Sequence, residues 1–204
     1  MFGLKSMTVI LIFACSALAG CSNATPQAVF DEANKCAEGA DYGGLCRCLT
    51  PEGQDQMAAL MVVAGVMQQK WAPSIVDSEK MEAELAEMKK VLEKHNVNPD
   101  DVKSSIFSGT SKQSDWGKEI KSVAAAIQNK PEFVADVMNV GDSSWKDFKV
   151  LSDKIPFGNA KLEDLKSQGD SATGVMVNSR GKQLLKFVKR EGMWLIAPDL
   201  DLVR

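Results

Sequence analysis

The stretch of the chain that decides the fold is residues 160–198, AKLEDLKSQGDSATGVMVNSRGKQLLKFVKREGMWLIAP. Apolar and polar side chains alternate along it with the two-residue period of half-buried strands, and glycine-bearing turns interrupt the alternation three times. The pattern predicts four consecutive strands, at 160–167, 171–178, 182–189 and 193–197. Because the turns between them are short, neighbouring strands should pair antiparallel as a meander.

The residues before this stretch have the period of helices instead. A capping side chain precedes proline at Thr25-Pro26, Thr50-Pro51 and Asn98-Pro99, and each pair is typical of a helix start. Apolar stripes predict five or six helices, at 26–38, 51–71, 78–94, after 114 and at 131–140, with a turn or short helix at 41–45. A sheet needs a covering layer. The predicted class is therefore α+β, with the N-terminal helices packed on a C-terminal four-stranded antiparallel meander.

Two of these helices admit more than one interpretation. No charged side chain lies between Met57 and Met67, which predicts a helix buried in the core, the alternative being a membrane-dipping or partner-binding face. The helix at 78–94 places its apolar residues on one stripe and its charges elsewhere, which favours a solvated outer helix over a partner groove.

The first residues of the chain predict a targeting signal rather than a folded element. A basic start at Met1 to Lys5 precedes the apolar run from Met7 to Ala19, which is typical of a secretory signal peptide and short for a transmembrane helix. The run leads into the four residues Leu18-Ala19-Gly20-Cys21, which are similar to the lipobox of bacterial lipoproteins. That resemblance implies a membrane anchor of acyl chains such as palmitate on Cys21. The alternative is an ordinary signal peptide with an incidental thiol at this position.

The domain organisation and location follow from this signal. We expect a signal peptide at 1–20, a lipidated tether at 21–25 and a single α+β domain at 26–204, mainly helical over 26–141 and mainly strands over 142–204. The resemblance implies a cell-envelope protein, and Ser22 favours the periplasmic face of the outer membrane if the cell is Gram-negative. A formal net charge of −3 leaves no basic excess for nucleic-acid phosphates, so we expect none as a partner.

A second resemblance lies in the two ends of the mature chain. An opening helix is followed there by motifs similar to small lipoproteins of unknown function with a nuclear transport factor 2-like (cystatin-like) fold. The motifs are Asp41-Tyr42, Leu49-Thr50-Pro51-Glu52, Ala172-Thr173-Gly174-Val175 and the run 187–196, FVKREGMWLI. The resemblance implies a curved sheet and helices around a cone-shaped pocket, in binding modules, assembly domains or enzymes. A long helical insertion between about 66 and 149 departs from the family pattern, and no catalytic residue carries over.

Residues that carry reaction chemistry are few. The only histidine, His95, lies where the 78–94 helix should end, which favours a surface histidine stabilised by the helix dipole over a catalytic base. The sequence offers no His-based metal cluster and no motif for a cofactor, so we predict neither. Among the mature cysteines, we expect Cys36 to form a disulfide with Cys46 or Cys48 in an oxidising envelope, leaving one thiol over. The alternative is a reactive or metal-binding Cys46-Arg47-Cys48.

These observations favour a noncatalytic ligand-binding or scaffold domain. Its partners would be the membrane through lipidated Cys21 and a small apolar ligand or an envelope protein. A pocket lined by Phe187 and Trp194 is one way to bind such a ligand, although a filled core is the expectation for these two side chains. The alternatives are a small enzyme that uses a cone-shaped pocket and a thiol- or metal-handling protein.

Overall fold

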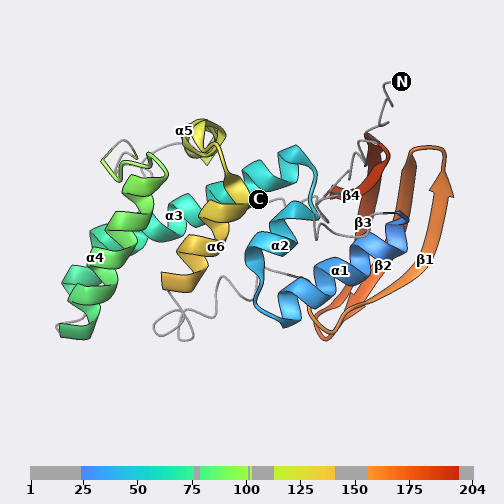
Figure 1. Cartoon of the computed structure of the whole chain (residues 1–204), viewed down its shortest axis with the longest axis horizontal. Coiled ribbons are helices and arrows are strands. Elements are labelled where there is room, and N and C mark those ends of the chain that lie inside the picture. The colour runs from blue at the N-terminus through green and yellow to red at the C-terminus, as the bar shows by residue number, and fades with distance from the viewer. Residues whose placement is uncertain (1–23, 76–78, 101, 103–112, 141–155, 198–204) are drawn as a thin grey trace, which may run out of the picture.

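The computed structural model describes residues 24–75, 79–100, 102, 113–140 and 156–197. The predicted signal peptide, Cys21 and Ser22 lie outside these residues. The described chain contains helices followed by strands (Figure 1). The helices are α1 (Pro26–Glu38), α2 (Tyr42–Arg47), α3 (Pro51–Ile75), α4 (Glu79–Lys94), α5 (Gln113–Ala126) and α6 (Lys130–Val140). The strands are β1 (Lys161–Gln168), β2 (Ser171–Asn178), β3 (Gly181–Arg190) and β4 (Met193–Ala197).

The sheet confirms the predicted meander. Its strand order is β1-β2-β3-β4, and every neighbouring pair is antiparallel. Alternate residues point to an inner face that is buried. The inner side chains below a tenth exposed are Ala172, Met176, Leu185, Phe187, Trp194 and Ile196. The α+β class is therefore correct, and the two-residue alternation placed these side chains on one face of the sheet because the pleat does so in any strand.

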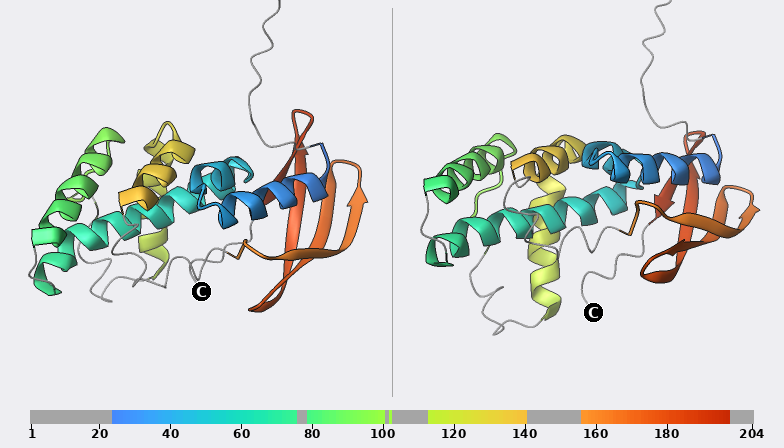
Figure 2. Two further views of the ribbon diagram at one scale, coloured as in Figure 1. Left: turned by 60° about the horizontal axis from the view of Figure 1, so that its bottom comes forward. Right: turned by 90° about the horizontal axis from the view of Figure 1, so that it is seen from below.

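Helix α1 covers the inner face of the sheet and contacts β1 and β4 (Figures 1 and 2). Its buried residues, including Val29, Phe30 and Ala33, join the same core as the inner side chains of the sheet. Asn34 fastens the helix to the segment before β1, because its Nδ2 donates to the carbonyl of Ala160 at 2.6 Å while its Oδ1 accepts from the Gly158 N–H at 3.0 Å.

The other helices form a layer that extends sideways from the sheet (Figure 2). At its centre is α3, which contacts α4, α5 and α6. The middle of α3 is buried on several sides, with Met61, Val62 and Val66 fully covered, which confirms the predicted core helix. No helix in the described part of the chain is long and apolar enough to cross a membrane. Helices α2 and α6 approach closely because Gly43 has no side chain: a Cβ there would lie 3.0 Å from the Pro131 carbonyl.

The link between α2 and α3 joins the helical layer to the edge of the sheet. The Thr50 N–H donates to the Ile196 carbonyl at 2.8 Å, and the Ile196 N–H donates to the Cys48 carbonyl at 2.9 Å. These two bonds satisfy part of the outer edge of β4, which would otherwise be open to another strand. The Thr50 hydroxyl also accepts from the Gly53 N–H at 3.2 Å, as a helix cap does.

Two of the three predicted helix starts are confirmed. Thr25 caps α1 by accepting from the Ala28 N–H at 3.1 Å, and Thr50 precedes α3. The third start, at Asn98-Pro99, is wrong within the described residues. There the Asn98 carboxamide accepts from the Asp100 N–H at 3.1 Å and forms a turn at 99–100. The same short side chain that caps a helix also closes such a turn, so sequence does not distinguish the two.

Candidate functional site

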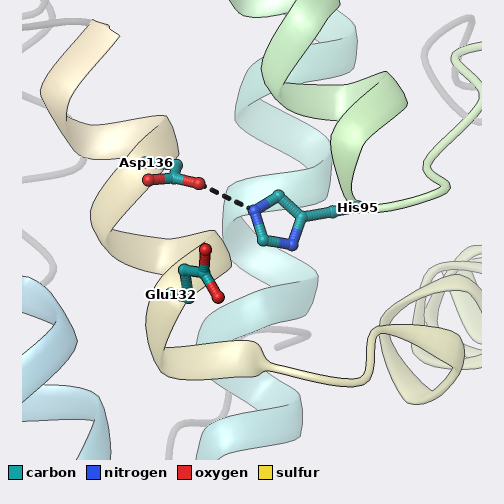
Figure 3. Close-up of side chains that lie close together, drawn as sticks. All are labelled: His95, Glu132 and Asp136. Atoms are coloured by element: carbon teal, nitrogen blue, oxygen red, sulfur yellow. Dashed lines mark hydrogen bonds and ion pairs between the residues drawn. The ribbon is translucent and has the colours of Figure 1, made fainter.

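A cluster of polar side chains lies where the end of α4 meets α6 (Figure 3). The residues that begin α6 and end α4 position the side chains of the cluster. Asn129 caps α6 by accepting from the Glu132 N–H at 3.3 Å, and its Nδ2 donates back to Glu132 Oε2 at 2.8 Å. Asp136 follows Glu132 by four residues and therefore lies on the same face of the helix.

The end of α4 supplies the other two members. The chain reverses after Lys94 through Asn96, whose φ of +58° is the left-handed conformation that commonly ends helices. The Val97 N–H then donates to the Leu92 carbonyl at 2.8 Å and closes the last turn. His95 lies within this turn, so its ring points from the end of α4 toward α6 (Figure 3).

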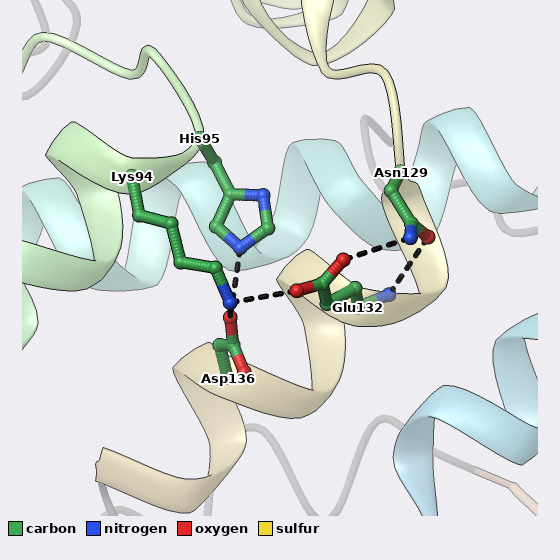
Figure 4. Close-up of polar contacts among 5 residues, drawn as sticks. All are labelled: Lys94, His95, Asn129, Glu132 and Asp136. Atoms are coloured by element: carbon green, nitrogen blue, oxygen red, sulfur yellow. Dashed lines mark hydrogen bonds and ion pairs between the residues drawn. The ribbon is translucent and has the colours of Figure 1, made fainter.

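Short contacts join the four charged or titratable side chains (Figure 4). His95 Nε2 lies 2.8 Å from Asp136 Oδ2, and because an ionised carboxylate only accepts, Nε2 is assigned as the donor. Lys94 Nζ donates to Glu132 Oε1 at 2.7 Å and to Asp136 Oδ2 at 2.8 Å. The rings of His95 and Phe133 also pack in a T-shaped arrangement, with 5.2 Å between their centroids. The side chain of His95 is only 6% exposed, whereas Lys94 is half exposed.

The contacts shift two of the titrations. Burial alone would raise the pKa of Asp136, but hydrogen bonds from His95 and Lys94 outweigh it and hold that pKa below its usual value. Hydrogen bonds to Asp136 and Glu132 raise the pKa of Lys94 to about 12. At neutral pH these shifts favour the carboxylate form of Asp136 and the ammonium form of Lys94.

The same residues are the candidate metal ligands in the described chain. His95, Glu132 and Asp136 each offer a ligand atom, and these atoms lie within 4.8 Å of one another. The Lys94 ammonium, however, already contacts both carboxylates, so a divalent cation would have to displace it. Among the described residues, the side chain hydrogen-bonded to the His95 ring is a carboxylate, and not a hydroxyl or thiol that the imidazole could activate as a base. We interpret the cluster as an ion-paired clamp between α4 and α6.

The prediction for His95 is thus wrong. A surface histidine was expected at the helix end, yet the ring is buried, and the fold brings Glu132 and Asp136 to it from about 40 residues away. The sequence carried a partial signal, because Glu132 and Asp136 have the spacing of one helical face. Nothing in the local pattern indicated that α6 would lie against the end of α4.

The predicted disulfide is absent from the structure. Cys36, Cys46 and Cys48 are all buried thiols. The Cys36 sulfur lies near two carboxylates, Glu32 at 3.8 Å and Asp41 at 4.0 Å. Burial raises the pKa of the Cys46 thiol to about 12, against the smaller lowering effect of Arg47. A thiol in this state is protonated at neutral pH and is a poor nucleophile or metal ligand.

The two predicted pocket residues lie on the inner face of the sheet. Phe187 is 1% exposed and Trp194 is 6% exposed, and both belong to the continuous core that α1 completes. They stand on neighbouring strands, since Phe187 pairs with Ile196 and Trp194 with Lys189. Their surroundings are those of packed core side chains.

The opposite face of the sheet is a second candidate site, which sequence reasoning missed. Register places on it alternate residues of all four strands. We call this set the basic sheet face. Its basic residues are Lys161, Lys166, Lys182, Lys186 and Arg190, and its apolar residues are Val175, Val177, Leu184, Val188, Met193 and Leu195. Leu184 is 57% exposed and Met193 is 49% exposed. The alternation of lysine with apolar residues along β3 was the available signal.

Comparison with protein-family models, curated proteins and solved structures found no match to this chain.

Proposed function

We propose that the protein is a noncatalytic binding module of the bacterial cell envelope, held at a membrane surface by a lipid on Cys21. The observation that carries the binding role is the basic sheet face. Leu184 and Met193 are large apolar side chains left exposed on it. Apolar residues gathered on one open face are typical of interaction sites when polar residues surround them.

The anchor rests on the lipobox at residues 18–21. Thr25 already caps α1, so three residues, 22–24, separate the folded domain from Cys21. A link this short keeps the domain close to the bilayer. Two or more acyl chains make such an anchor stable, since a single chain binds only reversibly.

The side chains with reactive potential support a noncatalytic role. The Lys94 ammonium already pairs with both acidic side chains of the His95 cluster, and the raised pKa of Cys46 keeps that thiol protonated. Enzymes commonly direct such groups toward a space where a substrate binds. Here the side chains of the clamp are directed toward one another (Figure 4).

Replacing Cys21 with serine tests the anchor. We expect the wild-type protein to incorporate labelled palmitate and to begin, after processing, with an acylated peptide at Cys21. The Cys21→Ser variant should incorporate none. The matched control is Cys15→Ser, which removes another cysteine of the N-terminal segment and should leave both labelling and processing unchanged. An unacylated wild-type N-terminus, or labelling that persists in Cys21→Ser, would overturn the proposal.

A further inference from the structure

Charge is divided unevenly between the two parts of the chain. Residues 26–140 carry twelve basic and eighteen acidic side chains, whereas residues 156–197 carry seven basic and four acidic ones. The near-neutral total therefore conceals an acidic helical part and a basic sheet. Such a separation gives the two ends of a molecule opposite potentials and orients it in an electric field or at a charged surface.

Register concentrates the positive charge on one face of the sheet. Lys186 pairs with Thr173 of β2 and with Ala197 of β4, and Lys166 pairs with the same Thr173 from the other side. On β3, three successive outward positions are occupied by Lys182, Leu184 and Lys186. Exposed lysines thus flank an exposed leucine in the middle of the face.

Acidic side chains offset only part of this charge. Glu163 lies on the face and contacts Lys182 at 3.4 Å. Glu52, at the start of α3, contacts Arg190 at 3.0 Å. Among the described strand residues, register places five basic side chains and one acidic side chain, Glu163, on the basic sheet face, so the strands give this face an excess of positive charge. Helix α1 packs on the buried side of the sheet (Figure 2), and α3 reaches the basic sheet face at its edge, through the Glu52–Arg190 ion pair.

We propose that the basic sheet face docks on the anionic lipid headgroups of the membrane that holds the protein, an inference that rests on the proposed lipid anchor. Lysine ammonium groups would lie at the phosphate level, with Leu184 and Met193 reaching toward the acyl boundary. Basic residues with interspersed apolar ones are the composition of surfaces that bind anionic bilayers. The attraction acts only within a Debye length, about 8 Å at physiological salt, so the face must approach the bilayer closely.

The length of the tether permits this approach. Five residues, 21–25, span at most about 17 Å when extended. Packed layers of secondary structure are separated by about 10 Å. The anchor can therefore reach the plane of the basic sheet face while α1 stays on the inner face.

Two other partners for the sheet, a second copy of the chain and a partner strand, fit less well. A second copy docked face to face would bring two positive surfaces together, which is unfavourable. Pairing of a partner strand with β1 is opposed by its irregular register between Glu163 and Lys166 and by the lysines along it, since bulges and charges protect sheet edges.

Lysine footprinting tests the docking on the intact lipidated protein. The protein is reconstituted into vesicles of phosphatidylcholine alone or of phosphatidylcholine mixed with phosphatidylglycerol, and acetylation of each lysine is measured by mass spectrometry. Lys161, Lys182 and Lys186 should react several-fold more slowly on the anionic vesicles. Lys89 and Lys90 on α4, which are also exposed, should react equally on both. High salt should remove the protection.

A charge reversal sharpens the test. Lys186→Glu should abolish the protection of Lys161 and Lys182, whereas the matched variant Lys90→Glu should preserve it. Both positions are exposed, so neither change should unfold the domain. Equal reactivity on the two vesicle types would overturn the docking while leaving the anchor standing. Protein that no vesicle retains would overturn the anchor itself. Protection in detergent that grows with protein concentration would assign the face to a second copy instead.

Discussion

Removal of the Asp136 carboxylate should destabilise the protein through the buried histidine. The side chain of His95 is 6% exposed, and Asp136 is its hydrogen-bond partner at 2.8 Å. In Asp136→Ala the imidazole N–H stays buried without that acceptor, and an unsatisfied buried donor costs about 1–3 kcal/mol. We therefore expect the free energy of unfolding to fall by about 2 kcal/mol at pH 7.

The matched control is Lys94→Met, which removes the other charged contact to Asp136 and keeps most of the side-chain stem. The side chain of Lys94 is half exposed, so water replaces its contacts when the cluster opens. Exposed ion pairs contribute little for this reason. We expect Lys94→Met to lower the free energy of unfolding by much less than Asp136→Ala does.

Acid should erase the difference between wild type and Asp136→Ala. The pKa of Asp136 is lower in the folded protein than in the unfolded chain, so folding favours the ionised carboxylate. The resulting stability is fully present above the unfolded pKa, about 3.9, and is lost as the pH falls through the lower folded pKa. The curves of unfolding free energy against pH should therefore converge below about pH 4.

These free energies are measured by urea denaturation, followed by tryptophan fluorescence and circular dichroism. The titration is repeated from pH 7 to about pH 2.5, roughly 1.4 units below the unfolded pKa. The assignment of a clamp fails if Asp136→Ala is no less stable than Lys94→Met at pH 7. It also fails if the gap between wild type and Asp136→Ala is as wide in acid as at neutral pH.

Three further predictions follow from buried groups elsewhere. Asn34→Ala should lower the free energy of unfolding by about 1–3 kcal/mol because two backbone groups before β1 lose their partners, whereas Gln27→Ala, an exposed change on the same helix, should have little effect in the same urea titration. Met61→Ala should cost about 2–5 kcal/mol by opening a cavity at the centre of α3, and an unchanged urea midpoint would contradict the buried position of this helix. Native protein at pH 8 should resist alkylation at Cys46, because burial raises the pKa of that thiol to about 12. The same cysteine should react after denaturation. Rapid labelling of Cys46 in the folded protein, measured by mass spectrometry, would contradict the burial.

The elements of the fold could be predicted from sequence where the signal is local. The strands β2 and β4 begin and end where the alternation and the turns placed them, and Thr25 and Thr50 act as helix caps. Strand period and helix capping depend on side chains within a few residues of one another, so both can be predicted from the local sequence. The turn at Asn98 was mistaken for a helix start because both structures use the same short-range hydrogen bond.

The candidate sites could be predicted only in part. Sequence identified His95 as the single histidine and placed Cys36, Cys46 and Cys48 after the predicted lipid attachment at Cys21, but it assigned His95 to the surface and a disulfide to these three cysteines. Both assignments depend on which distant element packs nearby. Carboxylates of α6 meet His95, and burial keeps Cys46 as a thiol, because the helices pack around α3 in a way that no local pattern specifies.

The sequence by itself determined the elements, their order and the antiparallel meander, because residue period and short turns act within a few positions of the chain. It also determined the charge difference between the helical and sheet parts. Only the tertiary structure decided that α1 covers the inner face of the sheet and that α3 becomes the centre of the helical layer. The same packing leaves the basic sheet face open and brings Lys94 and His95 to Glu132 and Asp136. These outcomes depend on which apolar surfaces bury one another, and the hydrophobic effect that drives burial depends on area and not on separation along the chain.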